Sequence, residues 1–574
     1  MTNAISVSSY TLNARCMLLP WRTRIHLAIF ITLIICTCLG ANTVYADVWY
    51  VDTPGIANNT ISGTTHVWSP ANGTIYTNVT IYVKNSGNLT ILAGTIVVVN
   101  ASQAIILDTQ SVLNITGTSA EPVLFKVNET GKKWNWIFFN DTGSYGTLNY
   151  VNITGARIGL LVNSSSILIY NSKFYENDEG VKLINSSDIR IENCTFKDNN
   201  NYGLTIVNCS NIRVSNCLSN NTKIGLFIDN STQITVSNYT ADYNDGIWIN
   251  DTSFSTFTEL KSYNNTFGFN ITGADTKGNY FKWCEARNNT KVGFNITAVG
   301  GDNTFFGCKA INNTVGVNVT SINWDAITFY WGILDNNTLY SANASAIAGA
   351  PARNVTFIYN WWGQTPPART GANKVGEFIN YTSFLNASLS AVDQIRVAAG
   401  THSLALTAAK VNASISTTVP ITLTVAWYSS NPGTSSVPYQ AGSYVDVHIN
   451  TSSGVNWVYI KLNYTGVLVK VEPYLKMFWW NGRAWKKCSD SGVNTTAKYI
   501  WARITSTTSP NIARLAGTPF SGGATPPFTG GFATTPPTIK HQLTTYPTYE
   551  STLLIGLILL LFLLFSTTLV KKKV

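Results

Sequence analysis

The side chains most able to support acid–base or metal chemistry are acidic residues in the middle of the chain. Paired carboxylates cleave glycosidic bonds, and aspartate clusters bind Ca²⁺. Most of these acids fall in predicted turns, where aspartate also has an ordinary structural role. We therefore expect no catalytic residue among them, and the alternative is a polysaccharide lyase or glycoside hydrolase that acts on extracellular carbohydrate. The set is Asp178, Glu179, Asp188, Asp198, Asp229, Asp242, Asp245 and Asp251.

Histidine and methionine are too sparse to predict a metal site. The histidines are far apart in the chain, and there is no Cys-x-x-Cys motif, so neither a zinc site nor a haem attachment is indicated. Only 3 methionines occur, and no histidine lies between His66 and His402, so that segment lacks the ligands that copper requires. We expect no metal, no cofactor and no enzymatic activity.

Four cysteines occupy matching positions in adjacent segments: Cys194 matches Cys217, and Cys284 matches Cys308. If these segments are stacked coils about 4.8 Å apart, each pair lies within the Cα range of a disulfide. Each pair is therefore predicted to be either a bridge or a ladder of buried thiols.

A repeat of 21 to 25 residues predicts the elements that carry these side chains. Each unit begins with a glycine followed by alternating apolar residues, continues with a second alternating run, and ends in a turn that contains asparagine. No helical period is present. The glycines are Gly159, Gly180, Gly203, Gly225, Gly246, Gly268, Gly293 and Gly316, and the turn asparagines are Asn177, Asn200, Asn221, Asn244, Asn265, Asn289 and Asn313.

The repeat predicts a parallel β-helix in which each coil stacks on the one before it. In the unit that starts at Gly225, the match to Leu204, Ile206, Ile247 and Ile249 predicts that Leu226 and Ile228 face inward and Phe227 faces outward. The turn asparagines are expected either to stack as an amide ladder or to carry glycans. In several Asn-Asn-Thr turns the glycosylation motif falls on the first asparagine, which leaves the second free to stack.

The repeats resemble the right-handed β-helix surface proteins of archaea and bacteria, in the pectin-lyase-like class, and the repeat region of periplasmic copper-binding proteins. The resemblance covers residues 66–385. It includes Asn88-Leu-Thr-Ile-Leu in its first part and Tyr359-Asn-Trp-Trp-Gly363 in its last part. It implies a right-handed β-helix. The Asn-Thr-Asp, Asp-Asp and Gly-His-Gly signatures of the enzymes in that class do not occur here, and the function of the copper proteins is not carried over.

Beyond about residue 390 the repeat gives way to alternating strands and turns, with Asn481-Gly482 between two aromatic runs as a hairpin signal. This pattern predicts a β-sandwich and resembles a C-terminal module of archaeal surface proteins. The expected fold class is all-β: a right-handed parallel β-helix (47–387), a β-sandwich domain (388–518) and one C-terminal transmembrane helix (551–570). A Pro/Thr-rich linker (519–550) would join the last two.

The two ends of the chain predict its location. Residues 1–46 have the basic, apolar and small-residue regions of a signal peptide that is cleaved after Ala46. Residues 551–570 form an apolar run followed by a Lys tail (571–574) that is expected in the cytoplasm. We therefore expect a cell-surface protein anchored in the plasma membrane by a single span, with its ectodomain outside.

Composition agrees with an exported chain, because only 11% of the residues are charged. When the six basic residues near the two ends are left out, the chain has 32 basic and 28 acidic residues. This near balance of charge predicts no nucleic-acid partner. The expected partners are the membrane and carbohydrate or cell-envelope proteins. Asn-x-Ser/Thr motifs recur throughout the ectodomain, and the glycosylation candidates are Asn72, Asn88, Asn114, Asn152, Asn220, Asn264, Asn288, Asn312, Asn463 and Asn494.

Overall fold

The computed structural model describes residues 49–50, 59–320, 327–344, 355–365, 367–368, 370–376, 379–381, 383–467, 471–515 and 517–525. The chain divides into two compact units, Met1–Ala524 and Thr525–Val574, and all strands named below belong to the first. The expected signal peptide, membrane helix, Lys tail and most of the linker lie outside the described residues. Within the described ranges, no helix has both the length and the hydropathy needed to cross a membrane.

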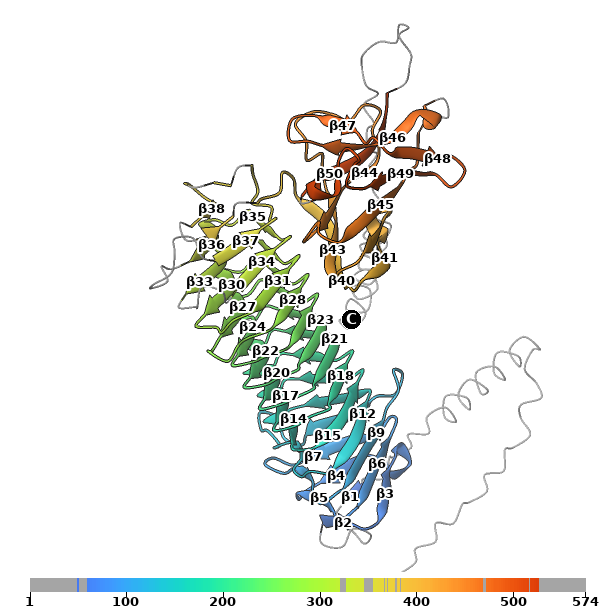
Figure 1. Ribbon diagram of the computed structural model, residues 1–574. Helices are drawn as coiled ribbons and strands as arrows, with labels where there is room; N and C mark the ends of the chain where they lie inside the picture. The colour runs from blue at the N-terminus through green and yellow to red at the C-terminus, as the bar shows by residue number, and fades with distance from the viewer. Residues whose placement is uncertain are drawn as a thin grey trace, which may run out of the picture. The chain divides into compact units, whose positions relative to one another are not determined.

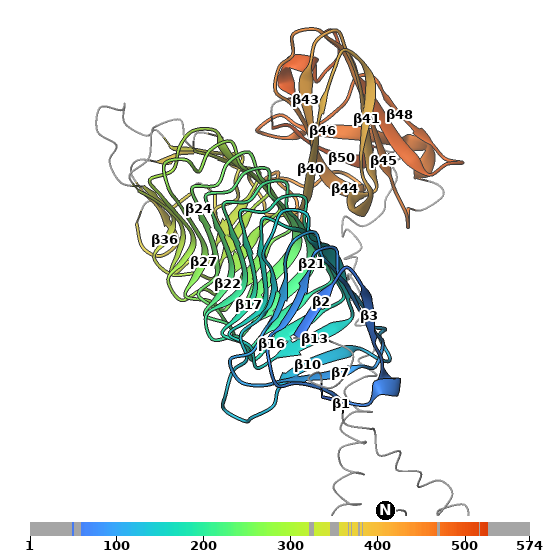
Figure 2. The same ribbon diagram turned by 90° about the horizontal axis from the view of Figure 1, so that it is seen from below.

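The first part of the chain is a parallel β-helix made of two long sheets (Figures 1 and 2). The 14-stranded sheet consists of β2 (Thr60–Ser62), β5 (Ile81–Lys84), β8 (Ile105–Leu107), β11 (Ile137–Phe139), β14 (Ile158–Asn163), β17 (Glu179–Ile184), β20 (Tyr202–Val207), β22 (Ile224–Asp229), β24 (Ile247–Asn250), β27 (Phe267–Thr272), β30 (Val292–Thr297), β33 (Val315–Thr320), β36 (Tyr340–Ala344) and β38 (Lys374–Val375).

The 25-stranded sheet supplies the other strands of each coil. It consists of β1 (Trp49–Tyr50), β3 (Thr65–Trp68), β4 (Ile75–Thr77), β6 (Asn88–Leu92), β7 (Ile96–Val99), β9 (Val112–Thr116), β10 (Val123–Val127), β12 (Tyr145–Asn149), β13 (Val151–Thr154), β15 (Ser166–Tyr170), β16 (Lys173–Tyr175), β18 (Arg190–Glu192), β19 (Thr195–Lys197), β21 (Arg213–Asn220), β23 (Thr235–Asp242), β25 (Thr256–Thr258), β26 (Lys261–Tyr263), β28 (Tyr280–Lys282), β29 (Glu285–Arg287), β31 (Asn303–Phe306), β32 (Lys309–Ile311), β34 (Ile327–Tyr330), β35 (Ile333–Asp335), β37 (Val355–Ile358) and β39 (Ile379–Asn380).

The coil register is the one that the alternating residues predict. Leu226 and Ile228 are fully buried, whereas Phe227 is partly exposed on the opposite face of β22. Ile228 pairs with Ile206 of the previous coil and with Ile249 of the next. The inward ladder predicted from these residues is confirmed.

The glycine of each repeat is required by the close approach of neighbouring coils. A Cβ atom on Gly180 would lie 2.5 Å from the carbonyl oxygen of Gly203, and one on Gly203 would lie 2.6 Å from that of Gly225. Real Cβ atoms do not come this close to a backbone oxygen, so only glycine fits.

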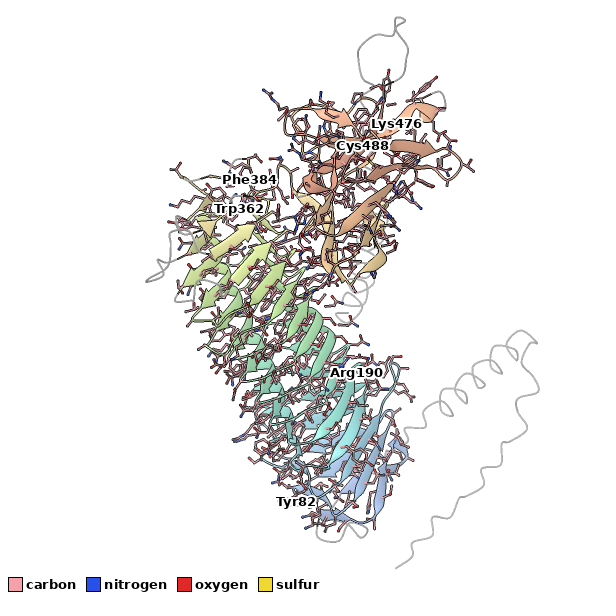
Figure 3. All side chains as sticks on the ribbon, in the orientation of Figure 1. Tyr82, Arg190, Trp362, Phe384, Lys476 and Cys488 are labelled. Atoms are coloured by element: carbon pink, nitrogen blue, oxygen red, sulfur yellow. The ribbon has the colours of Figure 1, made fainter. Side chains whose placement is uncertain are left out.

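Aromatic side chains stack along the inside of the C-terminal half of the β-helix. The ring centroids of successive phenylalanines are 4.7, 4.5, 5.4 and 5.1 Å apart from Phe257 through Phe281, Phe305 and Phe329 to Phe357. All five rings are buried. Trp362, labelled in Figure 3, belongs to the Tyr359-Asn-Trp-Trp-Gly363 segment near the end of the region of resemblance and is also fully buried.

An interior ladder of turn residues holds the coils together. The backbone amide of Asn289 donates to Oδ1 of Asn313 at 3.0 Å, and Asn265 donates to Asn289 in the same way. The ladder thus uses the second asparagine of these Asn-Asn pairs, as expected. Asn200 and Asn221 are exposed and stack on the outside of the coils, where each donates to an aspartate of the preceding coil, because the turns of those two coils place the preceding or following residue inward. The ladder is Asn177, Asn199, Thr222, Asn244, Asn265, Asn289, Asn313 and Asn337.

The second part of the chain is an antiparallel domain. Its six-stranded sheet contains β40 (Leu389–Val397), β43 (Ile421–Tyr428), β44 (Ala441–Ile449), β46 (Leu475–Trp480), β47 (Trp485–Lys487) and β50 (Pro519–Ala524), and its five-stranded sheet contains β41 (Gly400–Leu406), β42 (Val411–Thr417), β45 (Val455–Asn463), β48 (Ser491–Asn494) and β49 (Tyr499–Ile504). Short 3₁₀ helices are η3 (Pro70–Asn72) in the β-helix and η4 (Thr407–Ala409), η5 (Glu472–Tyr474) and η6 (Ile512–Arg514) in this domain.

The two antiparallel sheets share one hydrophobic core, to which Val425 and Val445 contribute from one sheet and Ile415 and Val458 from the other. The hairpin expected at Asn481-Gly482 is present, since β46 pairs with β47. The expected boundary at residue 518 was wrong: residues 519–524 form β50, which pairs with both β44 and β46. The strand fills the centre of its sheet, and for this reason it belongs to the domain rather than to the linker.

Candidate functional site

The eight acids that could have formed a catalytic centre all have partners within the coils. Seven accept hydrogen bonds: Asp178 from Asn200, Asp188 from Asn211, Asp198 from Asn221, Asp229 from Asn250, Asp242 from Asn264, Asp245 from Thr266, and Asp251 from Asn250 and the backbone of Asp275. Glu179 forms an ion pair with Lys182 at 3.5 Å. Most of these hydrogen bonds join one coil to the next, so the carboxylates act as acceptors that fix the coil register.

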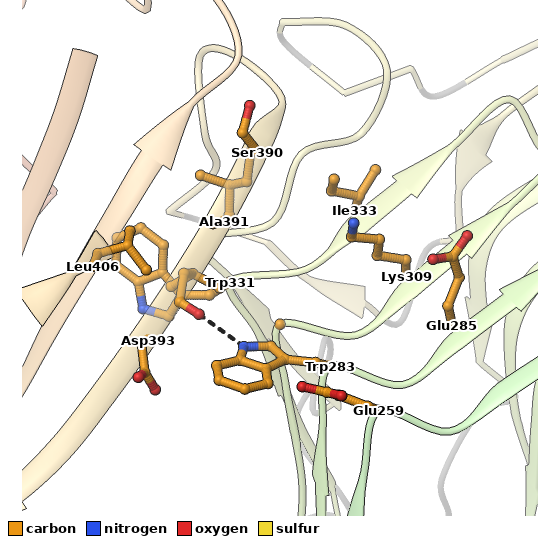
Figure 4. A pocket seen from close by; sticks show the side chains of 13 residues that line it. Glu259, Trp283, Glu285, Lys309, Trp331, Ile333, Ser390, Ala391, Asp393 and Leu406 are labelled. Atoms are coloured by element: carbon orange, nitrogen blue, oxygen red, sulfur yellow. Dashed lines mark hydrogen bonds between the residues drawn. The ribbon is translucent and has the colours of Figure 1, made fainter. Parts of the chain in front are cut away.

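A groove of about 320 Å³ lies between the β-helix and β40 of the antiparallel domain (Figure 4). The β-helix contributes Trp283, Glu285 and Lys309 to its lining, and β40 contributes Ala391 and Asp393. Pockets at domain interfaces with a few converging polar groups are common ligand sites.

The polar groups around the groove mainly join the two domains. The indole nitrogen of Trp283 donates to the carbonyl oxygen of Val392 at 2.8 Å, drawn as the dashed line in Figure 4. Lys282 pairs with Asp393 at 2.9 Å, and its ammonium lies 3.9 Å from the centre of the Trp283 ring. Nε2 of Gln394 donates to the hydroxyls of Tyr280 and Tyr330 at 2.9 and 3.0 Å. These contacts hold β40 against the coils that carry Tyr280, Trp283 and Tyr330, and we call this interface the joint. The groove lies at its edge.

The joint depends on a change in one column of residues that the sequence analysis missed. This column consists of one equivalent position in each coil, where the backbone is left-handed. In the middle coils the position is occupied by Asn193, Asn216 and Asn238. Further along, the same position holds Glu259, Trp283, Gly307, Trp331 and Tyr359. The loss of asparagine from a repeated position was the available signal, and it marks where β40 packs.

Gly307→Ala is expected to loosen this joint. A Cβ atom there would lie 2.6 Å from Cδ1 of Trp283 and 3.1 Å from Cγ1 of Val392, and the residue has a φ of +65°. Clash and backbone strain together should cost about 1–3 kcal/mol, seen as a lower melting temperature and faster proteolysis near residue 390. Gly301→Ala is the matched control, because a Cβ there has no atom within 4 Å. Equal effects of the two substitutions would contradict this account of the joint.

The cysteines have no features of reactive thiols. The six in the described residues are free and buried, and the backbone amide of Cys194 lies 3.4 Å from the sulfur of Cys217 in the next coil. Burial raises the pKa of the Cys194 and Cys308 thiols well above its ordinary value, and it raises the pKa of Cys209 to about 11. Because the thiolate is the nucleophile, these side chains are unreactive at neutral pH. In the structure the two pairs form thiol ladders rather than bridges.

The glycosylation candidates lie at the surface. Asn264, Asn288, Asn312 and Asn463 are exposed, and the other six are partly exposed: Asn72, Asn88, Asn114, Asn152, Asn220 and Asn494. The side-chain nitrogens of Asn288 and Asn312 donate to the asparagine one coil earlier, at 3.4 and 3.2 Å. Stacking thus gives these residues a structural role, and their glycosylation stays a prediction.

The described residues contain no group of three or more His, Cys, Asp or Glu side chains placed to hold a metal ion.

Residues 114–267 match the family described as a right-handed β-helix region. Among solved structures, the chain is similar to the Dettilon tailspike protein gp208, with 11% identity over 78% of this chain and 87% of that one and a TM-score of 0.30. It is also similar to the periplasmic alginate epimerase AlgG, with 15% identity over 53% and 72% of the two chains and a TM-score of 0.26.

A third similar structure is the A-module of the Azotobacter vinelandii mannuronan C-5 epimerase AlgE4, with 13% identity over 50% of this chain and 90% of that one and a TM-score of 0.25. The comparison with curated proteins gave no match. At these identities the likeness concerns the fold alone. The family match over residues 114–267 agrees with the right-handed β-helix that is expected from the repeats.

Proposed function

We propose that this chain is a membrane-anchored, heavily glycosylated extracellular surface protein of the archaeal type, with a structural, adhesive or glycan-recognition role. One observation carries the proposal: every one of the eight candidate acids in the coils is engaged by a neighbouring side chain or backbone group. A glycosidase needs one carboxylate free to donate a proton and a second free to attack or to activate water. Carboxylates that are engaged in contacts within and between the coils favour a scaffold role over a catalytic one.

The scaffold role has physical support in the packing of the β-helix and the antiparallel domain. Stacked ladders give each coil its hydrogen bonds and its core through its neighbours. The joint at β40 contributes an ion pair, a tryptophan hydrogen bond and a separate apolar cluster that includes Phe306, Trp331 and Tyr428. Residues 1–46 and 551–570 support the location at the membrane through their sequence patterns.

Protease treatment of intact cells should release the ectodomain and leave a small membrane-bound fragment with the Lys tail. The mature N-terminus should be Asp47, which N-terminal sequencing would measure. The purified full chain should leave neutral and acidic polysaccharides uncleaved with or without Ca²⁺, which chromatography of the polysaccharides would measure. An ectodomain protected on intact cells would refute the location. Chain cleavage that a single Asp→Asn substitution in the coils abolishes would favour the enzyme alternative.

A further inference from the structure

Three aromatic side chains form a patch on the outer face of the 14-stranded sheet. Tyr202 lies on β20, Phe227 on β22 and Trp248 on β24, which are consecutive strands labelled in Figure 1. Phe227 and Trp248 occupy paired positions in neighbouring coils, and the rings of Tyr202 and Phe227 are 5.6 Å apart. We call these three residues the aromatic ledge. All three are partly exposed, so their rings cover several successive coils and still meet solvent.

The ledge has fixed edges and a fixed orientation. The indole nitrogen of Trp248 donates to the backbone carbonyl of Asp245 at 3.1 Å, which holds the ring in place. In the same outward column, the coil before Phe227 carries Thr205 and the coil after Trp248 carries Asn270. At the end next to Trp248 the aromatic surface is therefore bounded by the polar, partly exposed Asn270. A rigid aromatic surface with a polar border suits a ligand that has apolar faces and polar edges.

Polar groups that could meet such a ligand lie directly beside the rings. Asp229 and Asn250 follow Phe227 and Trp248 by two residues on the same strands, so they point to the same side. Their side chains are joined by a 2.7 Å hydrogen bond, and each retains donor or acceptor capacity. Thr205 is only 3% exposed and its hydroxyl is covered, so a ligand on the ledge would meet Asp229 and Asn250 rather than Thr205.

We infer that the aromatic ledge binds a neutral oligosaccharide. The inference rests on the glycan-recognition role in the proposed function and names the ligand class. Pyranose rings offer C–H faces that stack on aromatic rings and hydroxyls that reach a carboxylate or an amide. Asp229, two residues after Phe227 on β22, adds a carboxylate on the side of the strand that carries the rings, whereas Lys182 of the same outward column is already paired with Glu179. Uronic acid chains would bring further negative charge to this site, so neutral sugars are favoured.

The test measures binding of neutral and acidic oligosaccharides to the full chain in detergent. The probes are hexasaccharides of glucose, mannose or N-acetylglucosamine, together with hexamers of galacturonate and mannuronate, and calorimetry gives the affinities. At least one neutral hexamer should bind ten times more tightly than either acidic one. Trp248→Ala and Phe227→Ala should each weaken that binding at least tenfold, whereas Trp248→Phe should retain most of it.

Tyr145→Ala is the matched control, because Tyr145 is a 56% exposed aromatic residue on β12 of the other sheet of the same β-helix. It should bind like the native chain, and melting curves should show that all variants are folded. Binding that survives both ledge substitutions, or an absence of binding to every neutral probe, would overturn the inference and leave a surface scaffold intact. Cleavage of a bound probe would instead refute the proposed function while supporting the ledge.

Discussion

Ile228→Asp is expected to unfold the middle coils of the β-helix, whereas Phe227→Asp on the adjacent position should leave them folded. Ile228 is fully buried between Ile206 and Ile249 in an apolar column. A carboxylate there has no cation or hydrogen-bond donor in that column, and burying it should cost several kcal/mol. Phe227 points to the solvent side of the same strand, so a carboxylate at this position keeps its hydration.

Hydrogen exchange of the full chain, read by mass spectrometry, would measure both outcomes. Because coils interact mainly with their neighbours, Ile228→Asp should raise exchange across residues 200–250 and leave β42 and β45 of the antiparallel domain protected. Equal protection in the two variants would show that the coil register is wrong. Loss of protection throughout the chain would show that the β-helix and the antiparallel domain unfold as one unit.

The parts of the fold that were predictable from the sequence are those that repeat. Alternation around each glycine gives the inward residues, because a strand has a period of two and a stack demands the same side at every coil. The turn residue that faces the interior was harder to predict from the sequence. In the coil that contains Asn221, the left-handed turn residue is Asn221 itself and Thr222 faces inward. The two residues are both small and polar, so composition alone does not distinguish them.

The joint could not be predicted, because it depends on contacts between residues distant in sequence. Trp283 and Val392 are 109 residues apart, and no local pattern pairs them. The exclusion of β50 from the predicted domain has the same origin. Residues 519–524 are rich in small residues and follow a glycine, and they become a strand through pairing with β44 and β46 on either side. Propensity is overridden here by tertiary contacts.

The face of the antiparallel domain that carries the joint also holds two titratable side chains of opposite type: Asp446, which is fully buried, and His448, which is partly exposed. Val445 and Val447 of β44 point into the shared core, and Asp446 and His448 point to the other side. The hydroxyl of Tyr428 donates to Asp446 at 3.0 Å. The His448 ring lies 5.7 Å from that of Trp331 and 4.9 Å from that of Tyr359, both in the β-helix. The other charged groups of the joint are the Lys282–Asp393 pair and Glu259, Glu285 and Lys309, which line the groove.

Burial shifts the two pKa values in opposite directions. It raises the pKa of Asp446 to about 7 and lowers the pKa of His448 to about 4. The folded state therefore keeps a proton on Asp446, and this contribution to stability is present below about pH 4 and is lost as the pH rises toward 7. The folded state keeps His448 neutral, and this contribution is present above about pH 6.5 and is lost as the pH falls toward 4.

Between about pH 4 and 6.5 these two effects should cancel, and single substitutions should separate them. In that range the pair holds one proton when folded, on Asp446, and one when unfolded, on His448, so it adds no pH dependence. Relative to the native chain, Asp446→Asn should lose about 1.4 kcal/mol of stability for each unit of falling pH, and His448→Gln should gain about as much. Urea titrations of the full chain at pH 4.5, 5.5 and 6.5, followed by hydrogen exchange in β43 and β44, would give these slopes. Slopes of the same sign in both variants would contradict the assignment, because only groups of opposite charge type buried on one face produce opposite slopes.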